Sequence, residues 1–138
     1  MKRLKNPALA MLSLAAILSF TSCEKDDDVT PAPAPSIVGL WKGKYGGVSS
    51  YPTSGYTMLF RSNGTVRVFD GTDTTTASKA EGTYNISGTT VTTNYTYLSS
   101  GPTYSTSATF NSIYTFMEGT YGAGAATSGS GQFFLVKQ

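Results

Sequence analysis

The chain has 138 residues, a formal net charge of +2 and charged side chains at only 13% of its positions. Its basic residues are too few and too scattered to form the clustered positive surface that nucleic-acid binding requires. With no histidine and a single cysteine, the chain also lacks the residues for a zinc site of the usual kind and for an internal disulfide.

Residues 1–22 have the layout of a secretory signal peptide. Lys2, Arg3 and Lys5 form a basic start, and an apolar run of thirteen residues, 8–20, ends two small residues before the cysteine. As a helix this run would be about 20 Å long, short of the roughly 30 Å hydrocarbon core of a bilayer. We therefore expect a signal that is removed and not a permanent membrane span.

Cys23 follows this signal directly, and it has two interpretations. One is a free or intermolecular thiol in a secreted protein. The other rests on residues 20–23, Phe-Thr-Ser-Cys, which resemble the lipoprotein box of bacteria. The resemblance implies that Cys23 is the lipidation site, becomes the new N-terminus and carries fatty acyl chains such as palmitate. Several chains, at about 0.8 kcal/mol per buried CH₂, anchor a protein stably to a membrane.

Residues 23–36 are expected to form an acidic, proline-rich tether. The charged run 24–28 and the alternating prolines of 31–35 cannot build a packed core, and proline favours extended backbone. The acidic run is either a solvated linker or an export signal, because it resembles the runs that follow the lipidated cysteine in Bacteroidota lipoproteins. We expect the cell outer membrane as the location, with the lipid anchor as the membrane contact and the domain facing either the cell surface or the periplasm.

Residues 37–138 are predicted to form one all-β domain. They are rich in Thr, Tyr, Val and Phe, and Gly, Ser and Asn interrupt them at intervals typical of short strands. Tight turns at 62–64 and 87–88 indicate that successive strands pair, and eight such strands close into an antiparallel up-and-down barrel. The predicted strands are 38–46, 55–61, 65–70, 79–86, 89–97, 103–111, 114–121 and 131–137.

Alternation predicts which side chains face the barrel interior. In the last two strands the pattern is ambiguous, because Phe116 competes with Met117 and Phe133 competes with Phe134; we place Phe133 inward together with Leu135. Residues of the opposite parity are polar and are expected outside, among them Thr57 and Ser105. The other inward residues are predicted to be Tyr56, Met58, Phe60, Val66, Val68, Tyr84, Ile86, Val91, Thr93, Tyr95, Tyr97, Tyr104, Thr106, Ala108 and Phe110.

Gly39-Leu40-Trp41 at the head of the first strand resembles the Gly-x-Trp signature of the lipocalin and avidin superfamily. In this family the Trp closes one end of an eight-stranded barrel and a basic residue of the last strand packs across its ring, a position that Lys137 occupies here. Alternatively, Trp41 is a core aromatic of another β-sandwich. The resemblance implies a small, largely apolar ligand in the barrel mouth. Five tyrosines either line that mouth or fill the core: Tyr56, Tyr84, Tyr95, Tyr97 and Tyr104.

We expect no catalytic residues, no metal site and no cofactor. Histidine, the commonest general base, is missing, and Asp70, Asp73, Glu81 and Glu118 show no recognisable spacing. Glu118 would share the inner face only if Phe116 did. The alternative to a ligand-binding barrel is a structural or interaction module that contacts a protein or polysaccharide through its outer surface and loops.

Replacement of Cys23 tests the lipid anchor. Cys23→Ala removes the sulfur that would be acylated, so we expect the full chain to move from the membrane fraction to the soluble fraction. Ser36→Ala, at the end of the tether, is the control and should leave the protein with the membranes. Unchanged fractionation of Cys23→Ala would contradict the lipoprotein interpretation.

Overall fold

The computed structural model describes residues 34–99 and 101–138. The predicted signal peptide, Cys23 and most of the predicted tether lie outside the described residues. Within them, regular structure consists of strands, and no helix is long and apolar enough to cross a bilayer.

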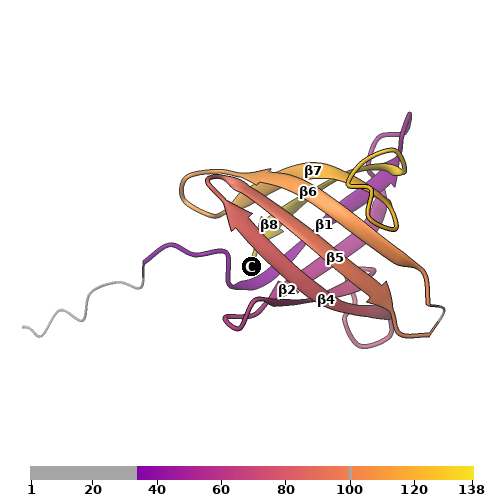
Figure 1. Ribbon diagram of the computed structural model, residues 1–138, viewed down its shortest axis with the longest axis horizontal. Helices are drawn as coiled ribbons and strands as arrows, with labels where there is room; N and C mark the ends of the chain where they lie inside the picture. Colours follow the sequence, from indigo (N-terminus) through magenta and orange to yellow (C-terminus); the bar gives the residue numbers. More distant parts are fainter. Residues whose placement is uncertain (1–33, 100) are drawn as a thin grey trace, which may run out of the picture. The chain divides into compact units, whose positions relative to one another are not determined.

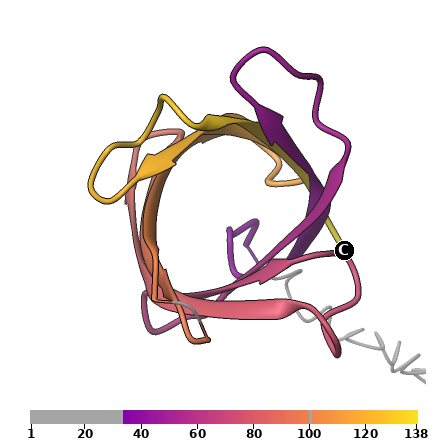
Figure 2. The same cartoon turned by 90° about the vertical axis from the view of Figure 1, so that its right-hand side faces the viewer.

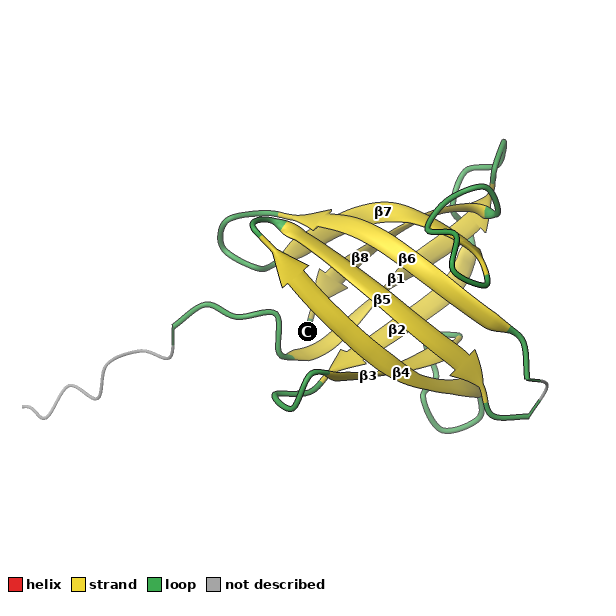
Figure 3. Cartoon of the chain, viewed as in Figure 1, coloured by secondary structure: helices red, strands yellow, loops and turns green. Residues whose placement is uncertain are grey.

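Eight strands form one closed antiparallel barrel (Figure 1, Figure 3). Each strand pairs with the next along the chain, and the last strand pairs with the first. This confirms the predicted all-β, eight-stranded up-and-down barrel, and the predicted strand boundaries agree to within two residues. The strands are β1 (Gly39–Gly47), β2 (Ser54–Phe60), β3 (Thr65–Asp70), β4 (Ser78–Ser87), β5 (Thr90–Tyr97), β6 (Thr103–Phe110), β7 (Phe116–Ala123) and β8 (Gly131–Lys137).

The two ends of the barrel differ in their connections. At the short-loop end, residues 61–64, 88–89 and 111–115 join the strands, and both the start of β1 and the end of β8 lie there. At the long-loop end, the connections are 48–53, 71–77, 98–102 and 124–130. Figure 2 views the barrel from the long-loop end, with the described segment before β1 crossing the opposite opening.

The interior follows the predicted alternation. Met117 is fully buried whereas Phe116 is 38% exposed, so the parity of β7 is settled and Glu118 lies on the outer wall. Phe133 and Leu135 are buried, which confirms their inward placement. Ile86, predicted to face inward, is 39% exposed, because it lies two residues before the turn at Gly88, where the wall ends and water reaches it.

Parts of the outer wall are less exposed than the sequence predicts, because two long loops fold back over them. Thr57 is fully buried, and its Oγ1 donates a hydrogen bond to the Gly71 carbonyl oxygen at 2.7 Å. Ser105 is also buried and donates to the Gly124 carbonyl oxygen at 2.7 Å. Both hydroxyls therefore have partners under the loops, as buried polar groups require.

Trp41 closes the short-loop end. Its side chain is fully buried, its Nε1 donates to the Ile37 carbonyl oxygen at 2.8 Å, and its ring meets Phe60 edge to face. The Lys137 ammonium lies 5.9 Å from the Trp41 ring centroid, within the range of a cation–π interaction. Gly39 has a φ of 133°, and a Cβ there would lie 3.1 Å from Lys137 Cε, so a side chain would be strained and would crowd the lysine.

Replacement of Trp41 tests this closure. Trp41→Ala should lower the free energy of unfolding by about 3–5 kcal/mol, because it leaves a cavity in packed core. Tyr51→Ala is the matched control, since Tyr51 is 77% exposed and should change stability little. Denaturant titration followed by circular dichroism measures both. Equal effects of the two substitutions would contradict a buried, stabilising role for Trp41.

Candidate functional site: a tyrosine cavity at the long-loop end

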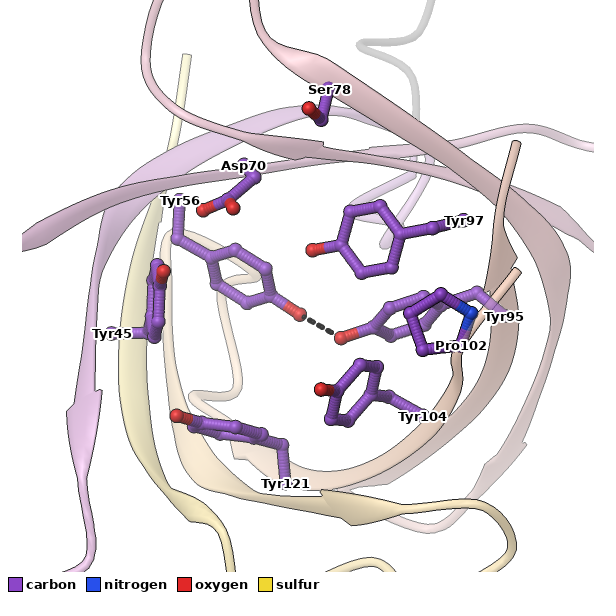
Figure 4. Close-up of a pocket in the computed structure, with 9 residues that line it drawn as sticks. All are labelled: Tyr45, Tyr56, Asp70, Ser78, Tyr95, Tyr97, Pro102, Tyr104 and Tyr121. Atoms are coloured by element: carbon purple, nitrogen blue, oxygen red, sulfur yellow. Dashed lines mark hydrogen bonds between the residues drawn. The ribbon is translucent and has the colours of Figure 1, made fainter. Parts of the chain in front are cut away.

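A cavity of about 280 Å³ opens at the long-loop end of the barrel (Figure 4). Six tyrosines supply most of its wall, and they come from five different strands. We call it the tyrosine cavity. Its lining residues are Tyr45, Tyr56, Asp70, Ser78, Tyr95, Tyr97, Pro102, Tyr104 and Tyr121.

Strand alternation and register bring these rings together. Odd-numbered strands end at the long-loop end and even-numbered strands begin there, so Tyr45 near the end of β1 and Tyr56 near the start of β2 are neighbours, with ring centroids 5.5 Å apart. Tyr95 and Tyr104 are directly opposite each other in the β5–β6 ladder, with ring centroids 6.2 Å apart. Neighbouring aromatic rings at such separations stabilise one another and fix their positions.

A hydrogen-bonded pair of hydroxyls lies between the rings. The Tyr56 and Tyr95 hydroxyl oxygens are 2.8 Å apart, and both side chains are buried (Figure 4). Beside this pair, the Tyr56 ring packs edge to face on Phe133 with centroids 5.4 Å apart. The pair therefore belongs both to the cavity and to the apolar core beneath it.

Glycine makes room for one wall of the cavity. Tyr121 lies opposite Gly131 in the β7–β8 ladder, and its hydroxyl donates to the Gly46 carbonyl oxygen at 3.3 Å. A Cβ on Gly131 would lie 2.8 Å from that hydroxyl and 2.0 Å from the Gly46 oxygen. Any side chain at position 131 would displace the Tyr121 ring or separate the strands.

Asp70 is the charged member of the lining, within the part of the chain that the structure describes. It ends β3 opposite Ser78, the first residue of β4, so the two polar side chains lie at the rim. Its carboxylate oxygens are directed toward the tyrosine rings (Figure 4). The rim therefore places one negative charge beside the aromatic walls.

Burial raises the pKa of several tyrosine hydroxyls in the cavity. Desolvation raises the pKa of Tyr56 well above its usual value, raises the pKa of Tyr95 to about 12, and also raises the pKa of Tyr97. Burial raises the pKa of Tyr45 as well, and the Asp70 carboxylate raises it further. At neutral pH the cavity thus offers neutral hydroxyls, each able to donate and accept a hydrogen bond.

Four of the tyrosines singled out from the sequence line the cavity, and one does not. Tyr56, Tyr95, Tyr97 and Tyr104 are brought together. Tyr84 lies near the other end of β4, where its hydroxyl donates to the Arg61 carbonyl oxygen at 2.8 Å and its ring packs on Phe60. The reason is height along the barrel, because β4 begins at the cavity with Ser78 and Tyr84 is six residues further down the strand.

Sequence reasoning missed Tyr45, Asp70, Ser78, Pro102 and Tyr121. Because every second residue of a strand faces the same side, Tyr45 shares the face of Trp41, Asp70 that of Val68, and Tyr121 that of Met117. The sequence therefore carried the signal for Tyr45 and Asp70, whereas Tyr121 follows only once the structure shows that Met117 faces inward.

The remaining sequence-predicted site residues lie elsewhere. Gly39, Trp41 and Lys137 are at the short-loop end, away from the cavity. Glu81, for which no site role was predicted, is on the outer wall, where Arg61 and Arg67 bind its carboxylate and hydrogen bonding to Arg61 lowers its pKa. Across the described residues, no three side chains of His, Cys, Asp or Glu gather closely enough to hold a metal ion.

A second hollow lies on the outer wall over β7 and β8, and we call it the outer groove. Its central feature is the pair Phe116 and Phe134, whose rings are stacked at 6.4 Å. Glu118 and Gln132 lie beside them, and Tyr51 from the β1–β2 loop borders the groove. This arrangement provides an exposed aromatic surface outside the barrel.

No protein-family model, curated protein or solved structure matches this chain. Its class is therefore defined by the fold and the cavity themselves. The protein is a closed, eight-stranded antiparallel β-barrel that is compatible with a lipocalin-like fold and has a tyrosine-lined cavity at one end.

Alkaline titration tests the burial of the cavity hydroxyls. The pKa of Tyr95 is about 12 in the folded state against 10.0 for the free side chain, so between these values the unfolded chain loses the proton first. The stabilisation is fully present below pH 10 and is lost as the pH rises through about 12, at about 1.4 kcal/mol per pH unit for this one group. Denaturant titrations at pH 9, 10 and 11 measure the fall.

Tyr95→Phe should reduce this fall, whereas Tyr51→Phe, which alters an exposed side chain, should leave it unchanged. Absorbance of tyrosinate near 295 nm provides a parallel readout. The same pH dependence in the wild type and in Tyr95→Phe would contradict a buried, protonated Tyr95.

Proposed function

We propose that the protein is a lipid-anchored lipoprotein of the cell envelope whose barrel binds a small molecule in the tyrosine cavity. The observation that carries this proposal is a cavity of about 280 Å³ at one end of a barrel whose other end is packed around Trp41. Eight-stranded barrels are just wide enough either to fill with side chains or to hold one small ligand. In this barrel, side chains fill the short-loop end around Trp41, and the long-loop end has room for a ligand.

The volume and lining of the cavity limit the size and chemistry of the ligand. Ligand pockets commonly measure about 300–1,000 Å³, so this cavity is at the small end and suits a compact molecule. The sequence alone predicted a largely apolar ligand. The tyrosine rings provide apolar area, but the hydroxyls and the Asp70 carboxylate also demand polar groups on the guest. We propose an amphipathic small molecule, held without chemical change.

The envelope location rests on the N-terminal sequence. A basic start, an apolar run and Cys23 in sequence support lipidation, and the acidic run after Cys23 supports export to the outer membrane of a Bacteroidota-type cell. The lipocalin and avidin resemblance gains support from the closed barrel and from the Trp41 and Lys137 pair at its packed end. We propose this family as the origin of the fold.

A second candidate function is interaction through the outer wall. The outer groove supports it, because Phe116 is 38% exposed and stacks on Phe134 beside Glu118. Exposed aromatic surface of this kind is typical of contacts with other macromolecules. Substitution of both phenylalanines by serine should then abolish capture of a protein or polysaccharide partner and leave small-molecule binding unchanged.

Native mass spectrometry tests the primary proposal. The full chain, purified gently from a bacterial host, should carry an extra mass that leaves on denaturation. Ser78→Trp fills the rim of the cavity and should abolish the extra mass. Ser87→Trp is the matched control, since Ser87 lies at the other end of the same strand and is exposed at the short-loop end.

The same three proteins are then screened by thermal shift against a panel of amines, sugars and aromatic acids. Stabilisation of the wild type and of Ser87→Trp, but not of Ser78→Trp, supports binding in the cavity. An extra mass retained by Ser78→Trp would show that the molecule binds elsewhere. No extra mass and no stabilisation by any compound would contradict the proposal.

A further inference from the structure

Most neighbouring rings of the tyrosine cavity meet at steep angles, whereas those of Tyr95 and Tyr104 are inclined at 31°. The rings of Tyr45 and Tyr121 are inclined at 82° with centroids 5.9 Å apart, those of Tyr97 and Tyr104 at 89° and 6.1 Å, and those of Tyr104 and Tyr121 at 65° and 6.3 Å. Two parallel rings would enclose a slot for a flat guest. Rings at these angles enclose a box, which suits a compact, rounded group.

Aromatic walls have an electrostatic preference. The faces of Tyr45 and Tyr121 are turned toward the cavity in Figure 4. The face of an aromatic ring is negative and its edge is positive, so ring faces attract cations, and boxes of such rings recognise substituted ammonium groups.

The Asp70 carboxylate at the rim also favours a cation. Asp70 contributes a carboxylate, and the cavity lining within the described residues contains no lysine or arginine. Arg61 and Arg67 are paired with Glu81 on the outer wall, and Lys79 donates to the Thr75 carbonyl oxygen. A positively charged guest would therefore find a carboxylate that has no basic partner in the cavity wall.

The tyrosine hydroxyls are compatible with a positively charged ligand. Tyrosine side chains are neutral at physiological pH, and burial raises the pKa of Tyr56 and Tyr95 further, so the hydroxyls add acceptor oxygens for N–H groups and no further charge. An anion would meet the Asp70 carboxylate and the negative ring faces. A neutral guest would gain from the rings but not from the carboxylate.

We propose that the ligand of the tyrosine cavity is a small organic cation, with a substituted ammonium group enclosed by the rings of Tyr45, Tyr104 and Tyr121 and faced by the Asp70 carboxylate. This inference rests on the proposed small-molecule function and assigns it a ligand class. Binding is noncovalent and leaves the cation unchanged.

Two probes of nearly equal shape test the inference. Choline carries a quaternary ammonium, and 3,3-dimethylbutan-1-ol replaces its nitrogen by carbon and is neutral. Isothermal titration calorimetry of the purified full chain should show choline binding at least about tenfold more tightly than the alcohol, because only choline gains from ring faces and carboxylate.

Matched variants identify the source of the preference. Asp70→Asn should weaken choline binding by about tenfold and change binding of the alcohol little. Asp73→Asn is the control, because Asp73 lies in the same loop region but outside the cavity lining, and both affinities should be unchanged. Tyr121→Phe keeps a ring face and should retain the preference for choline, whereas Tyr121→Leu should reduce it.

The outcomes separate this inference from the function on which it rests. Equal or tighter binding of the alcohol overturns the cation assignment and leaves a small-molecule cavity in place. Choline binding that is insensitive to Asp70→Asn also overturns it. If neither probe binds, the cation assignment fails, and the extra mass in native mass spectrometry, present in the wild type and absent from Ser78→Trp, decides separately whether the cavity binds another molecule.

Discussion

The pairing of β8 with β1 is the interaction on which the rest of the structure depends. It runs from Trp41 opposite Lys137 to Gly47 opposite Gly131, and it removes the free edges that an open sheet would expose. Closure also fixes which alternate set of side chains faces inward on every strand, because a closed barrel has a single interior. Gly43 permits the close contact, because a Cβ there would lie 2.0 Å from the Phe134 carbonyl oxygen.

One strand links the two ends of the barrel. On β1, Trp41 is buried in the packed short-loop end and Tyr45 lines the cavity, on the same face and four residues apart. Between these levels the Tyr56 and Tyr95 hydroxyls satisfy each other, as do those of Thr93 and Thr106 at 2.7 Å. Polar groups are thus paired throughout the transition from cavity to core, and the cavity is built without leaving a buried side-chain polar atom unpartnered among the described residues.

Local sequence patterns predicted the strands and the facing of their side chains, and failed where distance along the barrel or loop placement decides. Alternation assigned Tyr84 to the same face as Tyr95 but carries no information on height, which separates the two rings. Asp70 shares the inward parity of Val68, but only closure of the barrel places it beside the tyrosines of other strands. Thr57 and Ser105 are buried by loops whose positions depend on tertiary contacts. In β7, the sequence did not show whether Phe116 or Met117 faces inward, and only packing against the neighbouring strands determines this.

Two of the four long loops are tied to the outside of the barrel through the carbonyl oxygens of Gly71 and Gly124. Neither of these two loops lies as a lid over the mouth, so the proposed ligand would not have to wait for either of them to open. The residence time of that ligand would be set by its dissociation rate from the cavity and not by the opening of these loops. Occupancy would then follow the surrounding concentration promptly in both directions, which suits sampling of the environment better than long-term storage.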